Sequence, residues 1–431
     1  MDATTILTVY LVLLLAIPSP MVLSPLGSAG APSALLAPVI FLIWLWFTLR
    51  GTAPVAPAGP SRVALVWLLV MVVVYAHAMS LPIPSDEVSP ADNGLIKVVG
   101  YVGILVMASD GIASAERHRV LVRRLVVAVG LVAVLGLVQY LTRELYVDRL
   151  NIPGLTSGTS GWGLIIRNGY PRPSGTSTHP IEYGVVLTMA LPLAVAFARS
   201  SPSWRLLYRL VLVAIAFAVF LSISRSTLVC AFVGVAVMII GSRGWQRLWA
   251  LLGLLACAVV IYLTVPGVLG TIVGLFTSVS QDPSIASRTG SYELAWSFIQ
   301  QQPLFGRGFG TFLPKYWILD NGYLGMLIEA GVLGLGCLLA VLGTAFRAAW
   351  LSRRRALTDF DRDLSLAFMG SVAAGSAGLA FFDTFGFPQS AGCFFLVIGL
   401  AGGMLRFAGT GADPAVVQRD QPRVAPRVRQ P

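Results

Sequence analysis

Residues 207–241 have the sequence LYRLVLVAIAFAVFLSISRSTLVCAFVGVAVMIIG, which holds two apolar runs joined by a short polar stretch. Each run approaches the roughly 20 apolar residues that a helix needs to cross a bilayer. Between them lies Arg225, surrounded by Ser222, Ser224 and Ser226. An arginine at bilayer depth costs about 2.5–3.5 kcal/mol even on a lenient insertion scale, so this cation needs a structural or functional reason.

Apolar runs of this kind recur along the whole 431-residue chain, which is 56% hydrophobic and only 11% charged. Soluble domains carry about 25% charged residues, so the composition predicts an all-α integral membrane protein. We expect about twelve transmembrane helices in one polytopic domain, residues 1–408. The predicted spans are 4–23, 34–49, 63–81, 95–109, 121–141, 180–198, 207–223, 225–241, 247–265, 321–345, 364–382 and 390–407.

The basic residues predict the orientation of these spans. Alternate connections, together with the C-terminal tail, hold 21 of the 30 lysines and arginines, whereas the intervening connections are poorer in them. Because basic loops stay in the cytoplasm, both termini should be cytoplasmic and Arg225 should lie near the outer face. This topology explains the net charge of +11 without a nucleic-acid partner. The four cysteines lack CxxC spacing and indicate neither a metal site nor a disulfide framework.

Two predicted outer loops are long, residues 142–179 and 266–320, and both are rich in Gly, Ser, Pro and aromatic residues. Loops of this length are usually functional or disordered. In the second loop, SYELAWSFIQQ at residues 291–301 predicts a short amphipathic helix that lies on the membrane surface or on the bundle. Residues 409–431 are rich in Pro and Arg, which predicts a disordered basic tail in the cytoplasm.

Polar residues gather at the predicted outer face around two spans. Arg172 and His179 precede the sixth span, and Glu182 lies in its first turn. Glu182 has the alternative role of favouring the helix N-terminus. Arg225 has the alternatives of snorkelling to the surface or pairing with a carboxylate such as Asp383.

Further polar residues come from the second outer loop and the tenth span. Arg288 and Arg307 lie in the loop, Asp320 and Asn321 open the span, and Glu329 lies about two turns deeper. Loop cations are often merely solvated, and Asp-Asn is also a common helix cap. A carboxylate inside a span is harder to explain, because it must face the bundle or a cavity.

This combination of charges predicts phosphate chemistry at a membrane surface. The planar fork of arginine suits phosphate oxygens, and a diphosphate on a lipid carrier would explain Arg225 at its depth. Arginines can neutralise a leaving diphosphate while a histidine or carboxylate accepts a proton from an attacking hydroxyl.

Three stretches resemble the bacterial O-antigen ligase and polymerase family. RPSGTSTHPIEYG at 172–184 is similar to its Arg-x-Ser-Gly motif, and SISRSTLV at 222–229 to its Ser-Arg span start. AWSFIQQQPLFGRGFGTF at 295–312 and DNGYLGMLIEAGVLGLG at 320–336 resemble its Pro-Leu-Phe-Gly-x-Gly loop and the helix that follows. The resemblance covers residues 165–340, and the flanking spans agree only in number and hydropathy.

The resemblance implies a membrane glycosyltransferase at the outer leaflet of the bacterial cytoplasmic membrane. Such an enzyme needs no metal or cofactor and inverts the anomeric carbon. It transfers a glycan from an undecaprenyl- or other polyprenyl-diphosphate donor to a glycan or glycolipid acceptor, and other polysaccharide-export proteins are its possible partners. The family's fold is a twelve-helix bundle with a large outer loop over a cleft.

The resemblance also assigns roles to residues. Arg172 and Arg225 correspond to arginines that grip the pyrophosphate, with Arg288 and Arg307 assisting from the loop. Asp320 stands where many ligases have a histidine, which leaves Asp320, His179 and Glu182 as alternatives for the base. Polymerase and ligase activity both remain open. The supporting residues are Asn321, Tyr323 and Glu329.

Two other classes of function fit parts of the sequence. Twelve spans also suit a secondary transporter or a flippase for lipid-linked sugars, which predicts charged residues near the bilayer midplane and broken spans in matching halves. The polar residues here cluster toward the outer face instead, which favours chemistry at the surface. A non-catalytic scaffold would tolerate loss of the arginines.

Overall fold

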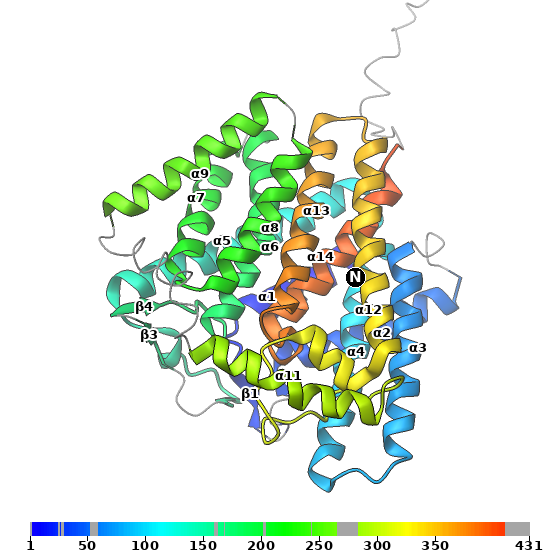
Figure 1. Cartoon of the computed structure of the whole chain (residues 1–431). Helices are drawn as coiled ribbons and strands as arrows, with labels where there is room; N and C mark the ends of the chain where they lie inside the picture. The colour runs from blue at the N-terminus through cyan, green and yellow to red at the C-terminus, as the bar shows by residue number, and fades with distance from the viewer. Residues whose placement is uncertain are drawn as a thin grey trace, which may run out of the picture.

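The computed structural model describes most of the chain as one helical bundle (Figure 1). Its described residues are 2–24, 26, 30–51, 59–158, 163–167, 169–200, 204–242, 244–264 and 283–409. The predicted tail at 409–431 lies almost wholly outside them.

Long helices that run up and down make up the bundle. They are α1 (Ala3–Leu15), α2 (Pro32–Leu49), α3 (Gly59–Met79), α4 (Ser85–Asp110), α5 (Ala115–Thr142), α6 (Pro180–Ser200), α7 (Arg205–Leu221), α8 (Arg225–Gly241), α9 (Trp245–Thr264), α12 (Gly322–Arg355), α13 (Asp359–Leu379) and α14 (Pro388–Phe407).

A helix lies over each of the twelve predicted spans, so the helical character of the apolar runs is confirmed. Within the described residues, seven helices are long and apolar enough to cross a membrane, namely α2, α3, α4, α5, α6, α12 and α14. The chain is therefore a multi-pass membrane protein by the length and composition of its helices, while the number twelve stays a prediction.

The first predicted span, 4–23, is wrong in its second half. The helix ends at Leu15, because Pro18 and Pro20 follow and a proline lacks the N–H that a helix interior needs. Residues Met21–Leu23 form strand β1, which pairs antiparallel with β2, Leu155–Ser157. At about 1.5 Å per residue, the 13 residues of α1 are shorter than the ~30 Å hydrocarbon core.

The centre of the bundle consists of α6 and α14, whose apolar windows are 89% and 83% buried. Small residues let their neighbours approach. A Cβ on Gly399 of α14 would collide with the carbonyl of Leu105 on α4, and a Cβ on Gly184 of α6 would collide with Thr227 on α8. Such close packing of small residues is typical of helices that associate in membranes.

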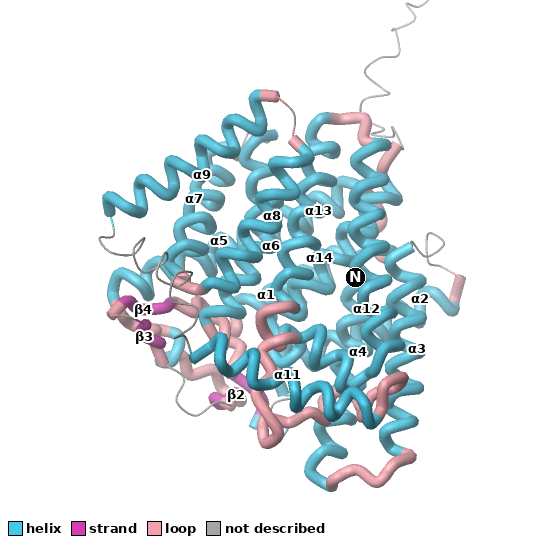
Figure 2. Tube along the Cα trace, in the orientation of Figure 1, coloured by secondary structure: helices cyan, strands magenta, loops and turns pink. Residues whose placement is uncertain are grey.

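The two ends of the bundle differ in character. Strands β1, β2 (Leu155–Ser157), β3 (Ile165–Arg167), β4 (Tyr170–Arg172) and helix α11 (Pro283–Gln301) lie toward one end (Figures 1 and 2). The basic α8–α9 and α12–α13 connections and the end of α14 lie toward the other. Ion pairs join its basic segments, with Arg119 bound to Asp361 at 2.8 Å and Arg117 to Asp2 at 2.8 Å.

The expected short helix in the second outer loop is present and longer than predicted. One face of α11 is buried through Ala295 and Ile299, which cluster with Leu319 and Ile328. On the other face, Tyr292 and Trp296 are exposed. The helix therefore packs on the bundle with one side and presents aromatic rings with the other.

Candidate functional site

The loop with the sequence PLFGRGFG, residues 303–310, closes over a break in α12. This helix is interrupted at Gly331, where φ is 64° and ψ is −168°. The loop supplies partners for the backbone groups that the break releases, with Gly308 N donating to Glu329 O at 2.8 Å and Val332 N to Pro303 O at 2.9 Å. Buried backbone groups must find such partners, so the loop and the break stabilise each other.

Glycine is required at this junction for two reasons. Gly331 has a positive φ, which other residues adopt only at a cost, and a Cβ there would collide with the carbonyl of Leu304. A Cβ on Gly306 would collide with the backbone of Glu329. The glycines of the motif therefore position the outer loop rather than contact a ligand.

Arg307 fastens the same loop to the start of α4. Its Nη2 lies 2.6 Å from Oε2 of Glu87, which is 0% exposed, and 3.3 Å from the hydroxyl of Tyr316. The guanidinium also lies over the rings of Phe298 and Tyr316, at 4.9 and 4.7 Å. This cation, predicted to bind diphosphate, is engaged within the protein in this structure, and we interpret it as a structural residue.

The other predicted residues of this region have mainly internal contacts. Asn321 caps α12, since its Oδ1 accepts from Leu324 N at 3.1 Å. The hydroxyl of Tyr323 donates to Ser376 O at 2.7 Å, which joins α12 to α13. Oε1 of Glu329 accepts from Phe312 N at 3.0 Å and so ties the loop to the helix. Arg288 lies in α11, but its side chain is outside the described part of the chain.

A polar cluster holds the segment that follows β4 in place. Gly175 has a φ of +59°, and its N–H donates to Gln139 Oε1 at 2.8 Å while Gln139 Nε2 donates back to its carbonyl at 2.9 Å. Thr176 Oγ1 donates to Leu15 O at the end of α1, at 2.8 Å, and accepts from Gln389 Nε2 at 3.0 Å. The turn predicted at Gly175 thus connects α1, α5 and α14.

Glu182 is fully buried and bound to backbone donors. Its Oε2 accepts from Thr178 N at 2.8 Å and its Oε1 from Gln389 N at 2.7 Å. The first donor belongs to the segment before α6, and the second belongs to the first turn of α14. Glu182 therefore neutralises orphan N–H groups of two helix starts, and the alternative helix-terminus role fits this geometry better than that of a base.

Arg172 reaches from β4 to the end of α7. Its Nε donates to Ser222 O at 3.3 Å, and the residue is only 7% exposed. Burial, together with the charge of Arg167, lowers the pKa of Arg172 to about 10. The guanidinium is still protonated at neutral pH, so a full positive charge lies beside the α7–α8 turn.

That turn carries Arg225 as the first residue of α8. Ser224 caps the helix by accepting from Thr227 N, and Ile223 is fully buried with a φ of +45°, which is rare for a β-branched residue. Ser222 and Ser226 are also buried. Because Gly184 of α6 touches Thr227 of α8, these parallel helices start at one level, which places Arg225 beside the segment with Arg172 and His179.

His179 ends the same segment, with its ring 6.3 Å from that of Phe387. Burial, and then the charge of Arg172, lowers the pKa of His179 to about 4, so it is neutral at pH 7. Its Nδ1 accepts from Ile181 N at 3.2 Å. In a neutral ring the other nitrogen, Nε2, then carries the proton, so His179 offers a hydrogen-bond donor to the site rather than a free base.

A second group of charges comes from α4 and the α13–α14 connection. Asp383 is exposed, yet the surrounding protein raises the pKa of its carboxyl, Lys97 counteracts this, and Asp320 raises it further. A side chain that is both accessible and closely surrounded lines a concave opening. Asp320 itself is half-buried.

Lys97 is the residue that our sequence prediction missed. It is one of only two lysines in the chain and lies inside the predicted fourth span, 95–109. A lone ammonium within an apolar run was the signal that would have identified it. Asp383 had appeared only as a partner for Arg225.

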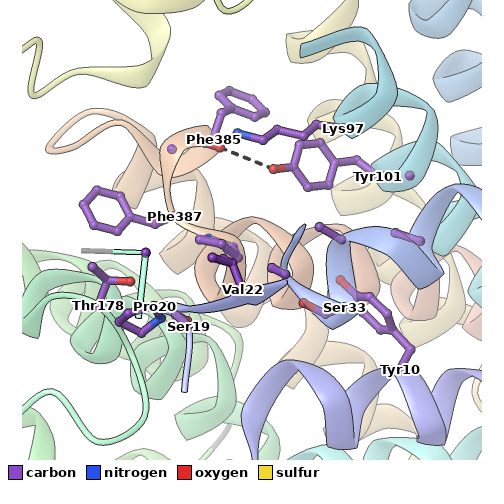
Figure 3. A pocket seen from close by; sticks show the side chains of 17 residues that line it. Tyr10, Ser19, Pro20, Val22, Ser33, Lys97, Tyr101, Thr178, Phe385 and Phe387 are labelled. Atoms are coloured by element: carbon purple, nitrogen blue, oxygen red, sulfur yellow. Dashed lines mark hydrogen bonds between the residues drawn. The ribbon is translucent and has the colours of Figure 1, made fainter. Parts of the chain in front are cut away.

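An open cavity of about 190 Å³ lies next to this group (Figure 3). Lys97 and Tyr101 of α4 line one side, Phe385 and Phe387 of the α13–α14 connection another, and Thr178 the edge near His179. The hydroxyl of Tyr101 donates to Phe385 O at 3.3 Å. Among the described residues, no group of three or more His, Cys, Asp and Glu side chains could hold a metal ion.

Comparison with protein families decides the identity of the central region. Residues 210–339 match a family model described as O-Antigen ligase. These residues are an O-antigen ligase domain. The resemblance to the O-antigen ligase and polymerase family that the sequence motifs indicated is thereby confirmed.

The O-antigen ligase domain includes one of the two converging arginines and the loop with its helix. Arg225, Arg307 and Asp320 lie inside the matched range, whereas Arg172, His179 and Glu182 precede it. The structure brings the earlier segment against the matched one through the bond between Arg172 and Ser222. The candidate site is therefore assembled from both.

Other comparisons add little to this result. No curated protein matches the chain. A solved structure titled "Structural coordination of polymerization and crosslinking by a peptidoglycan synthase complex" is 15% identical and covers 80% of this chain and 96% of its own, with a TM-score of 0.42. At that score the likeness carries no argument about the O-antigen ligase domain.

Proposed function

We propose that this protein transfers a glycan from a polyprenyl-diphosphate donor to a hydroxyl acceptor, as a surface-glycan ligase or polymerase. The observation that carries the proposal is the convergence of Arg172 and Arg225 from separate segments onto the α7–α8 turn, where Arg172 binds Ser222 O. Two guanidinium groups near the end of a bundle are suited to a lipid diphosphate. The match to the O-antigen ligase family supports the same reaction.

The step itself displaces the lipid diphosphate from the sugar. The acceptor oxygen forms a bond to the anomeric carbon while the bond from that carbon to the phosphate oxygen breaks. The electron pair leaves with the diphosphate, whose added charge Arg172 and Arg225 neutralise. A carboxylate takes the proton of the acceptor hydroxyl, and attack opposite the leaving group inverts the anomeric carbon.

Asp320 suits the role of base better than the two alternatives. Glu182 is 0% exposed, and backbone N–H groups bind both of its oxygens. His179 has its acceptor nitrogen engaged by Ile181 N–H. Asp320 is half-buried beside Asp383, where a neighbouring carboxylate favours proton uptake near neutral pH.

The orientation is part of the proposal. The site lies at the end of the bundle with the strands and α11, and the basic α8–α9 and α12–α13 connections lie at the opposite end (Figure 1). The positive-inside rule then places the site outside the cytoplasmic membrane and both termini in the cytoplasm. Donor and acceptor would be glycolipids or glycans of the cell envelope.

The test uses purified protein in detergent, a polyprenyl-diphosphate oligosaccharide and no ion gradient. We expect Arg225→Ala and Arg172→Ala each to reduce transfer by about 10²–10³-fold, the usual cost of one contact to a developing negative charge. Arg149→Ala is the matched control, because Arg149 is an exposed cation of the same outer loop, paired with Glu144. Unchanged transfer in both test variants, at normal folded yield, would remove the mechanism. Transport without transfer would instead support the transporter class.

A further inference from the structure

We infer that the cavity beside Lys97 binds the sugar ring that carries the acceptor hydroxyl. This inference rests on the proposed function and names the second substrate of the same site. The cavity lies between α1, the α1–α2 connection, α2, α4 and the α13–α14 connection, on the far side of that connection from Arg172. None of its lining residues was predicted as a site residue from the sequence.

The walls of the cavity offer polar groups of both kinds. The ammonium of Lys97 and the hydroxyls of Tyr10, Ser33 and Thr178 line it. Ser19 also lines it, and its hydroxyl is buried with no hydrogen-bond partner within the described residues. A buried hydroxyl without a partner costs free energy, so a ligand with hydroxyl groups would satisfy it.

The charges nearby favour a neutral polyhydroxyl ligand over an anion. Lys97 acts on Asp383 and on Glu329, and Asp320 also acts on Asp383. Three carboxyl groups thus share the neighbourhood of one ammonium, and a phosphate would meet repulsion as well as attraction. Sugar hydroxyls both donate and accept hydrogen bonds, so they can bind Lys97 and a carboxylate at the same time.

The apolar walls and the size agree with this ligand. The rings of Tyr101, Phe385 and Phe387 line the cavity (Figure 3) and can cover the less polar faces of a sugar. About 190 Å³ is smaller than the roughly 300–1,000 Å³ of sites for drug-sized ligands. The space therefore suits about one ring and not a complete oligosaccharide or a lipid diphosphate.

The position of the cavity connects it to the reaction. Phe387 lies in its wall and has its ring 6.3 Å from that of His179, whose neighbour Thr178 also lines the cavity. His179 in turn lies close enough to Arg172 for the charges to interact. The donor diphosphate at the arginines and a sugar in the cavity would thus lie on two sides of His179, with Asp383 and Asp320 at the cavity side.

Capture of the natural ligand tests the inference without knowledge of its identity. A photo-crosslinking amino acid replaces Ala34, which lines the cavity, in the full chain produced in its own cells. Leu42 on the same helix is 60% exposed and serves as the control position. After illumination, mass spectrometry of the purified protein identifies what is attached. We expect a glycan at position 34 and none at position 42.

Two further variants distinguish acceptor from donor. Lys97→Met should lower the yield of the glycan adduct by about tenfold, the effect of losing one hydrogen bond to a charged group, in protein that remains monodisperse. Arg225→Ala should abolish transfer but leave the adduct at position 34. A glycan adduct lost in Arg225→Ala would identify the donor, and a phospholipid or no adduct at position 34 would overturn the inference. Full activity of Arg225→Ala would instead overturn the proposed function while the adduct still reported the cavity.

Discussion

Replacing Glu182 with alanine should destabilise the fold rather than remove a catalytic base. The carboxylate accepts from Thr178 N at 2.8 Å and from Gln389 N at 2.7 Å, and it is 0% exposed. Hydrogen bonds to a charged group contribute about 1.5–3 kcal/mol each, so the loss of both costs roughly 3–6 kcal/mol. With the usual unfolding entropy per residue, this lowers the unfolding midpoint of a chain of this size by about 3–7 °C.

The assay measures thermal unfolding in detergent by tryptophan fluorescence, together with transfer activity at 20 °C below the midpoint of each variant. Glu144→Ala is the control, since that carboxylate is exposed and bound only to exposed Arg149, and such pairs contribute about 0–1 kcal/mol. We expect a large shift for Glu182→Ala and almost none for the control. An inactive Glu182→Ala variant with an unchanged midpoint would refute the structural role and restore Glu182 as a candidate base.

Two further predictions concern the loop junction and the histidine. Gly331→Ala should weaken transfer and expose residues 303–310 to proteases, because the new Cβ would collide with the carbonyl of Leu304 and the positive φ costs about 1–2 kcal/mol; Gly336→Ala in the same helix, where nothing lies within 4 Å of the new atom, should leave both measurements unchanged. For His179, whose pKa of about 4 lies below its ordinary 6.5, the unfolded chain binds the extra proton between these values, so stability rises with pH across that window and is flat above it. His179→Gln should flatten the rise and change transfer at pH 6–8 far less than the ~10²–10⁴-fold that a general base contributes; a loss of that size would contradict the assigned tautomer.

The sequence predicted the helices well because a membrane span depends on local composition. An apolar run forms a helix wherever its backbone must satisfy itself in lipid, so every predicted span has a helix over it. The first span failed because hydropathy continues through Pro18 and Pro20 while the helix ends at Leu15. The break at Gly331 was also beyond prediction, since the apolar pattern continues through it.

The sequence identified the charged residues of the site but not their partners. Glu182 and Arg307 belong to motifs of the family, yet the structure places backbone donors around one and Glu87 beside the other. Glu87 lies 220 residues before Arg307, and such pairs depend on how distant helices meet. Lys97 was missed because it belongs to none of the motifs, although its charge within an apolar run marked it as costly.

The arrangement of helix starts explains why the charges separate into two groups. At the proposed outer end, α6, α8, α12 and α14 all begin, and their first turns carry partial positive charge. Glu182 neutralises this charge around the starts of α6 and α14, whereas only a serine hydroxyl caps α8. The positive field is therefore strongest where Arg172 meets the α7–α8 turn, and it weakens toward Asp383 and Asp320. An anionic donor and a neutral acceptor would be sorted by this gradient before any specific contact forms.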